Sequence, residues 1–134
     1  MISDSERKAL IEYRIEQAHK AIKEVEILKE NSLLSLAVNR IYYGMFYVLS
    51  SLALKHKFKT SKHGQLIGWF NKNFVKEGTI EQKYSKIIQN AFENRSEGDY
   101  EPFVELNEDQ VQEMFEDMKD FINILEIYIM TPEK

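Results

Sequence analysis

The chain has 134 residues, of which 43% are hydrophobic and 30% are charged. This length suits a single domain, and the composition predicts a packed core and excludes intrinsic disorder. The absence of cysteine excludes disulfides, zinc–thiolate sites and thiol nucleophiles together.

The N-terminal stretch MISDSERKALIEYR carries charges along its length and has no continuous apolar segment, so it does not resemble a secretory signal. The longest apolar run, residues 41–54, is shorter than the roughly 20 residues that a membrane span requires. We therefore expect a cytoplasmic protein that makes no contact with a membrane.

Charge is distributed unevenly along the chain. Residues 1–92 contain 15 basic and 9 acidic side chains, whereas residues 93–120 contain 2 basic and 11 acidic side chains. Four of the lysines gather in residues 55–62, KHKFKTSK. Such a cluster is either a solvated loop or a basic patch for a nucleic acid or another acidic partner.

Hydrophobic periodicity is helical almost throughout. The first predicted helix begins at Ser3, where Glu6 completes a capping box, and its apolar stripe extends to Leu28. A second helix, from about residue 32 to 56, is apolar on most sides and is therefore expected to be central and buried. A shorter helix is predicted over residues 62–74.

Capping patterns also mark the later helices. Thr79 with Gln82 predicts the start of a fourth helix, which ends in the stretch SEGDYEPF because glycine and proline are poor helix residues. Asn107 with Gln110 predicts the start of the last helix.

No stretch shows the alternation of a strand, so the predicted fold is all-α. Four long helices and one short helix would form an up-and-down antiparallel bundle. The bundle would be a single domain over residues 1–134, with its core at residues 8–129 and a frayed tail at residues 130–134.

The second helix carries one polar-tipped stripe on an otherwise apolar surface. Arg40, Tyr43 and Tyr47 are spaced i, i+3 and i+7, which places them on one side of the helix. A buried arginine requires a carboxylate or several carbonyl groups to offset its lost hydration. The stripe is therefore either a structural ion pair covered by tyrosines or an anion-binding arginine at a groove or subunit contact.

Two other positions could carry chemistry. Arg95 and Asp99, in NRSEGDY, either complete the end of a helix or present a guanidinium to a phosphate. His63, in SKHGQL, either hydrogen-bonds locally or acts as a general acid or base. The three histidines are far apart, and the chain has no phosphate loop or GxSxG motif, so we expect no metal and no cofactor.

Three motifs, in order, resemble the HEPN family, the higher eukaryote and prokaryote nucleotide-binding domains. An Ala-x-x-Arg-x-Tyr-Tyr-x-x-Phe-like helix spans residues 37–46, a Lys-His-Gly-like turn spans residues 62–64, and an Arg-x-x-x-Asp-Tyr segment spans residues 95–100. The match covers roughly residues 8 to 129.

This resemblance implies an antiparallel bundle of four to five helices, often a homodimer, that is commonly encoded beside a minimal nucleotidyltransferase as a toxin–antitoxin module. It also implies that toxic members are metal-independent ribonucleases, whose arginine is followed four to six residues later by a histidine at the dimer interface. Here Tyr100 stands where that histidine is expected after Arg95. Tyrosine, with a pKa of about 10, is a poor general base near neutral pH.

The leading hypothesis is therefore a non-catalytic or weakly active dimer that binds a nucleotide-type ligand or a nucleotidyltransferase partner. Arg40, Tyr43 and Tyr47 would line an interface or groove. The rest of one polar cluster would come from the later part of the chain: His63, Arg95, Asp99 and Tyr100. An ion pair would join Asp99 to Arg40 or to Arg95.

Two alternatives stay open. The chain could be a toxin endoribonuclease that cuts single-stranded RNA without metal, with Arg95 stabilising the phosphorane and His63 or Tyr100 moving protons. It could also be a purely structural or interaction module whose conspicuous polar residues only fix the helix register.

Overall fold

The computed structural model describes residues 2–95 and 106–132. It contains five α-helices and one π-helical turn: α1 (Asp4–Glu30), α2 (Leu34–Lys55), α3 (His63–Phe70), η1 (Asn71–Val75), α4 (Gln82–Asn94) and α5 (Glu108–Met130). The described residues include no strand, and the predicted all-α fold is confirmed.

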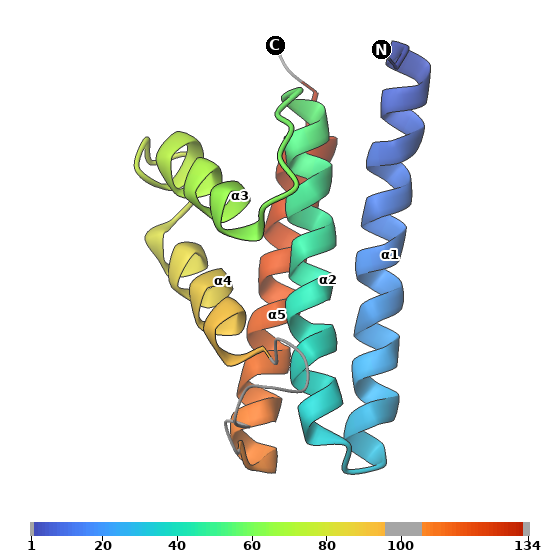
Figure 1. Ribbon diagram of the computed structural model, residues 1–134, viewed down its shortest axis with the longest axis vertical. Helices are drawn as coiled ribbons and strands as arrows, with labels where there is room; N and C mark the ends of the chain where they lie inside the picture. The colour runs from blue at the N-terminus through green and yellow to red at the C-terminus, as the bar shows by residue number, and fades with distance from the viewer. Residues whose placement is uncertain (1, 96–105, 133–134) are drawn as a thin grey trace.

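The long helices alternate in direction along the chain (Figure 1). α1 runs down one edge, α2 returns beside it, α4 descends obliquely across the other side, and α5 runs back up next to α2. The short α3 is inserted between α2 and α4. This is the predicted up-and-down bundle, and α2 and α5 consequently end on the same side of the molecule.

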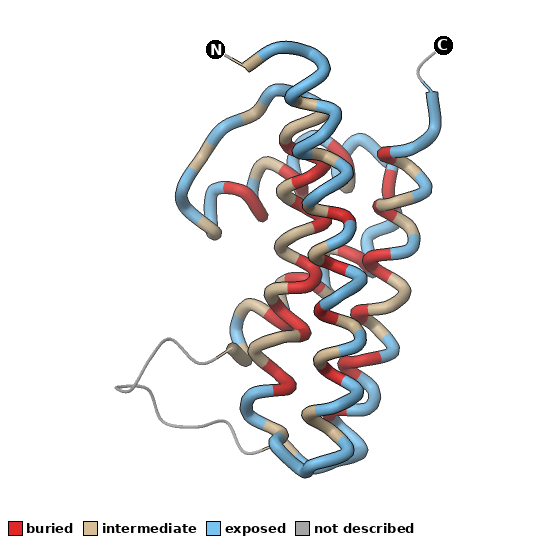
Figure 2. Tube along the Cα trace, turned by 90° about the vertical axis from the view of Figure 1, so that its right-hand side faces the viewer, coloured by how far each residue is buried: buried red, intermediate tan, exposed pale blue. Residues whose placement is uncertain are grey.

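The core is organised around α2, which contacts each of the other four α-helices. Eleven of its 22 residues are buried, and buried positions run through the middle of the bundle (Figure 2). The buried hydroxyl of Ser51 donates a hydrogen bond of 2.9 Å to the carbonyl of Ile11 on α1. The buried hydroxyl of Ser51 therefore has a hydrogen-bond partner, which offsets the free-energy cost of removing it from water.

Two of the three predicted capping boxes are confirmed. The side chains of Ser3 and Asn107 accept hydrogen bonds from the backbone amides three residues later, and Glu6 and Gln110 complete the boxes. These side chains satisfy amides that the first turn of a helix leaves without partners.

The prediction of a third capping box, at Thr79, is wrong. α4 begins at Gln82, and its N-cap is Glu81 without a side-chain cap. Ile80 is buried instead, with its amide donating to the carbonyl of Phe74 at 3.0 Å. Burial of an apolar side chain therefore outweighs the capping pattern at this point.

The short helix also differs from its predicted form. It is α-helical only to Phe70, after which the chain makes a π turn, with the amide of Lys76 bonded to the carbonyl of Asn71 at 2.8 Å. The wider turn keeps both Phe70 and Phe74 buried.

In the described part of the chain, no helix is both long and apolar enough to cross a bilayer.

Gly44 lies where α1, α2 and α5 meet. A Cβ atom added there would overlap Met118 Cε and lie 3.2 Å from the Cβ of Ala21. We expect Gly44→Ala to lower the free energy of unfolding by about 1–2 kcal/mol, because a well-filled core must shift to admit the methyl group. Thermal denaturation measures the effect.

Gly68→Ala is the matched control for this prediction. A Cβ atom added at Gly68, on α3, meets nothing within 4 Å. Alanine should therefore stabilise the helix there by up to about 1 kcal/mol through its higher helix propensity. A Gly44→Ala protein that melts at or above the wild-type temperature would contradict this account of the helix junction.

Candidate functional site

His63, the first residue of α3, is held against α2 by a hydrogen bond and by ring stacking. Its Nδ1 atom lies 2.7 Å from the hydroxyl oxygen of Tyr42, and its ring stacks on Phe46 with centroids 4.1 Å apart and planes 16° apart. Tyr42 and Phe46 are four residues apart and so share one side of α2. Because Tyr42 is fully buried, its hydroxyl needs this partner.

Arg95, at the end of α4, also contacts Tyr42, although it comes from a different helix than His63. Its guanidinium carbon lies 4.4 Å from the ring centre of Phe92 and 5.2 Å from that of Tyr42. His63 and Arg95 therefore both rest on Tyr42 although 32 positions separate them. We call Tyr42, Phe46, His63, Phe92 and Arg95 the Tyr42 cluster.

The Tyr42 cluster combines a cation, an imidazole and aromatic faces. His63 and Arg95 are both partly exposed, whereas Tyr42 is fully buried beneath them. A guanidinium presents planar donors that suit a phosphate. The exposed part of the cluster therefore carries a cation and an imidazole, groups that would suit a phosphate-bearing ligand.

Arg40 turns the other way, towards α1. Its Nη2 atom donates to Glu24 Oε1 at 2.8 Å, and its guanidinium carbon lies 5.8 Å from the ring centre of Tyr47. Burial alone would lower the pKa of Arg40, but Tyr47 and Glu24 outweigh it and raise that pKa. The two side chains are 31% and 39% exposed, so this ion pair contributes at most about 1 kcal/mol.

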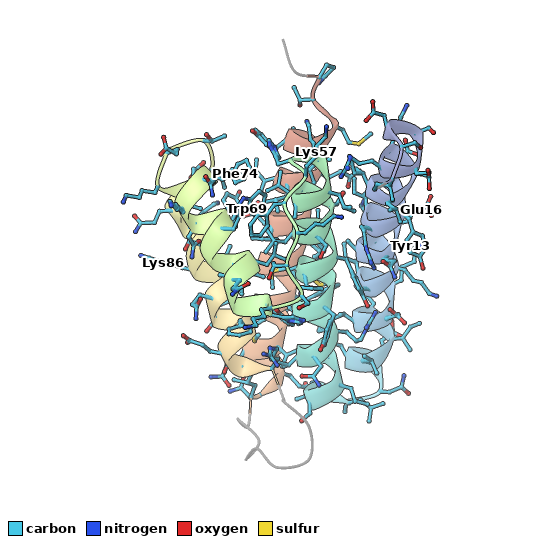
Figure 3. All side chains as sticks on the ribbon, turned by 45° about the horizontal axis from the view of Figure 1, so that its top comes forward. Tyr13, Glu16, Lys57, Trp69, Phe74 and Lys86 are labelled. Carbon is cyan, nitrogen blue, oxygen red and sulfur yellow. The ribbon has the colours of Figure 1, made fainter. Side chains whose placement is uncertain are left out.

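Two grooves meet at this ion pair; together we call them the α1–α2 grooves. Each groove is lined by both partners of the ion pair and by apolar or aromatic side chains from the two helices. The first is lined by Glu24, Ile27, Leu28, Leu36, Asn39, Arg40 and Tyr43, and the second by Tyr13, Glu16, Gln17, Lys20, Glu24, Arg40 and Tyr47. Figure 3 shows Tyr13 and Glu16 on the outer side of α1.

The predicted residues do not form one cluster in the described structure. Arg40 and Tyr47 belong to the α1–α2 grooves, whereas His63 and Arg95 belong to the Tyr42 cluster. Tyr43 joins the two, because it lines the first groove and its ring meets His63 edge-on at 6.1 Å.

Asp99, Tyr100 and the ion pair predicted for Asp99 lie outside the described residues. Within the described ranges, no three histidine, cysteine, aspartate or glutamate side chains come together as a metal site would require.

Sequence reasoning missed four residues of these sites. It assigned no site role to Tyr42, Phe46 or Phe92, and it did not identify Glu24 as the partner of Arg40. A signal existed for Tyr42 and Phe46, since their spacing places both on the side of α2 that the next helix must cover. Glu24 gave no such signal, because α1 carries many exposed acids and only the pairing with α2 selects one of them.

Comparisons with known proteins identify the family of the chain. The sequence profile of the HEPN domain matches residues 11–128. A UPF0332 protein of Thermotoga maritima is 34% identical over 122 residues, covering 91% of this chain and 92% of the relative. A Methanocaldococcus jannaschii protein named "Putative toxin MJ0142" is 27% identical, covering 92% of this chain and 84% of its own length. "Putative toxin MJ0605", from the same organism, is 37% identical and covers 67% of each chain.

Proposed function

The chain belongs to the HEPN family, and we propose that it acts in the cytoplasm as the HEPN member of a toxin–antitoxin-like pair. Its partner would be a minimal nucleotidyltransferase. The names of two relatives support the toxin–antitoxin role, since both contain the word toxin. The pairing with a nucleotidyltransferase is supported by the resemblance of the three sequence motifs.

The ligand we propose is of the nucleotide type, and its site is the Tyr42 cluster. The observation that carries this proposal is that His63 and Arg95, from different helices, both rest on the ring of Tyr42. Arg95 would hold a phosphate, and His63 would contact the sugar or base. We favour binding without efficient catalysis, because no histidine follows Arg95 anywhere in the chain.

Binding of ATP, measured by isothermal titration calorimetry, tests the ligand site. We expect Arg95→Ala and His63→Ala each to weaken binding at least about tenfold, since a hydrogen bond to a charged group contributes about 1.5–3 kcal/mol. Arg14→Ala and His19→Ala, both on α1, are the matched controls and should bind as the wild type does.

Two results would contradict the ligand proposal. Equal dissociation constants for all four variants would show that the Tyr42 cluster is not the ligand site. Changed melting temperatures without measurable binding by any variant would favour the purely structural module.

One observation favours a second function, a metal-independent ribonuclease acting on single-stranded RNA. His63 could move protons while Arg95 stabilises the phosphorane, because both lie against Tyr42. Expression of the wild type should then slow growth of a host and cleave its RNA, and Arg95→Ala should abolish both effects. Normal growth with intact RNA in wild-type-expressing cells would remove this function.

We further propose that the protein is a homodimer joined through the α1–α2 grooves. Ile27, Leu36 and Tyr13 are 59%, 53% and 52% exposed, which concentrates large apolar side chains around the Arg40–Glu24 pair. Apolar side chains grouped in this way on a surface commonly mark a protein contact. The partly exposed ion pair would lose its remaining water in the contact and fix the relative orientation of the subunits.

Analytical ultracentrifugation tests the dimer. We expect Ile27→Glu to shift the protein to the monomer, because the introduced carboxylate would be buried without a partner. We expect Arg40→Ala to raise the dimer dissociation constant and to lower the melting temperature by about 3 °C.

Ile127→Glu is the matched control for the dimer test. Ile127 is 54% exposed but lies on α5, away from the α1–α2 grooves. A dimer that survives Ile27→Glu, or an Arg40→Ala protein with unchanged mass and melting temperature, would refute the proposed interface.

A further inference from the structure

Positive charge is concentrated in one part of the fold. Residues 55–86 contain eight lysines and two acids, whereas the rest of the chain contains ten basic and twenty acidic side chains. These residues run from the end of α2 through α3 and η1 into α4. Figure 3 shows Trp69 and Lys86 on the side of the molecule opposite to Tyr13 and Glu16, with Lys57 between them at the end of α2.

Two of these eight lysines have structural roles. Lys55 caps the end of α5 by donating to the carbonyl of Ile129 at 2.7 Å, and Lys83 pairs with Asp120 at 3.3 Å. The other six are exposed and form no ion pair with any described residue: Lys57, Lys59, Lys62, Lys72, Lys76 and Lys86. Their charges are available to a partner.

An aromatic platform lies among these lysines. The rings of Phe58 and Trp69 stack with centroids 4.8 Å apart and planes only 6° apart. Phe74 meets the Trp69 ring at a steep angle, with centroids 5.2 Å apart, and so braces it from the core. Both stacked rings remain partly exposed, and Phe58 is flanked in the sequence by Lys57 and Lys59.

The backbone at Lys57 is in the left-handed region, with φ of 57°. This residue follows the C-cap of α2, where glycine is the usual occupant because it adopts this conformation without strain. The position therefore carries a lysine at a conformational cost. The retention of a lysine in a strained conformation indicates that its side chain has a role beyond forming the turn.

We propose that Lys57, Phe58, Lys59 and Trp69, the lysine–tryptophan surface, bind single-stranded RNA. The lysines would contact phosphates, and unpaired bases would stack on the exposed parts of the two rings. Alternating cations and flat rings suit a chain in which phosphates alternate with bases, and this combination is typical of surfaces that hold single strands. An acidic protein segment would match the charges but would leave the stacked rings without a role.

The lysine–tryptophan surface shares no residue with the Tyr42 cluster, so it does not depend on the nucleotide-type ligand proposed above. Failure of ATP binding would leave this inference standing. Failure of the test below would leave the Tyr42 cluster unaffected.

Trp69 is the only tryptophan in the chain, so its fluorescence reports directly on the surface. The purified full chain is titrated with a 12-nucleotide oligouridylate and, for comparison, with polyglutamate of equal charge. We expect RNA to quench Trp69 and its affinity to fall steeply with salt, because bound lysines release counterions. Polyglutamate should bind more weakly and should leave the fluorescence unchanged.

Charge reversal tests the lysines. We expect the double variant Lys57→Glu, Lys59→Glu to bind RNA at least about tenfold more weakly and with a smaller salt dependence. Lys8→Glu with Lys23→Glu, both exposed on α1, is the matched control and should retain wild-type affinity.

A second pair of variants separates binding from folding. Lys57→Gly should raise the melting temperature by about 3 °C, because it relieves the left-handed conformation, and should still weaken RNA binding. Ser32→Gly relieves the same conformation after α1, where φ is also 57°, and should raise stability without changing RNA affinity.

Three results would overturn the inference. The first is an affinity for polyglutamate equal to that for RNA with equal quenching, which would indicate an acidic protein as the partner. The second is RNA binding without any change in Trp69 fluorescence. The third is unchanged RNA affinity in both Lys57→Gly and the double charge reversal.

Discussion

The packing of α2 against all four other α-helices is the constraint on which the rest of the structure depends. A helix enclosed in this way must be apolar on most sides, and any polar atom that it carries must find a partner on a neighbour. Ser51 does so on α1, and Tyr42 does so on α3. The polar contacts of α2 therefore also fix how its neighbours sit.

Both candidate sites arise at the boundaries of this central helix. On one side, the side chain of Arg40 extends from α2 and pairs with Glu24 of α1, and both residues line two grooves. On the other side, Tyr42 gathers His63 from α3 and Arg95 from the end of α4. The bundle thus brings residues that are distant in sequence against one central helix, which gives both sites a rigid support.

Helix positions were predictable because local signals agree with the fold. The caps at Ser3 and Asn107 and the apolar character of α2 were all visible in the sequence. The sequence did not show that the capping pattern at Thr79 would fail, because the burial of Ile80 is a tertiary effect. The π turn of η1 was equally hidden from a periodicity of 3.6. Arg40 and His63 were recognised as unusual, but the pairing of Arg40 with Glu24 depends on how α1 packs against α2.

Tyr43 lies between the two sites, since its ring meets His63 of the Tyr42 cluster edge-on and also lines a groove beside Arg40. We expect an event that repositions this ring to change the binding free energy at the Tyr42 cluster and at the α1–α2 grooves together, and such coupling is reciprocal. Occupancy of the Tyr42 cluster and association of two chains would therefore be linked equilibria. The dimer dissociation constant of this protein would then depend on the concentration of the ligand at which it is measured.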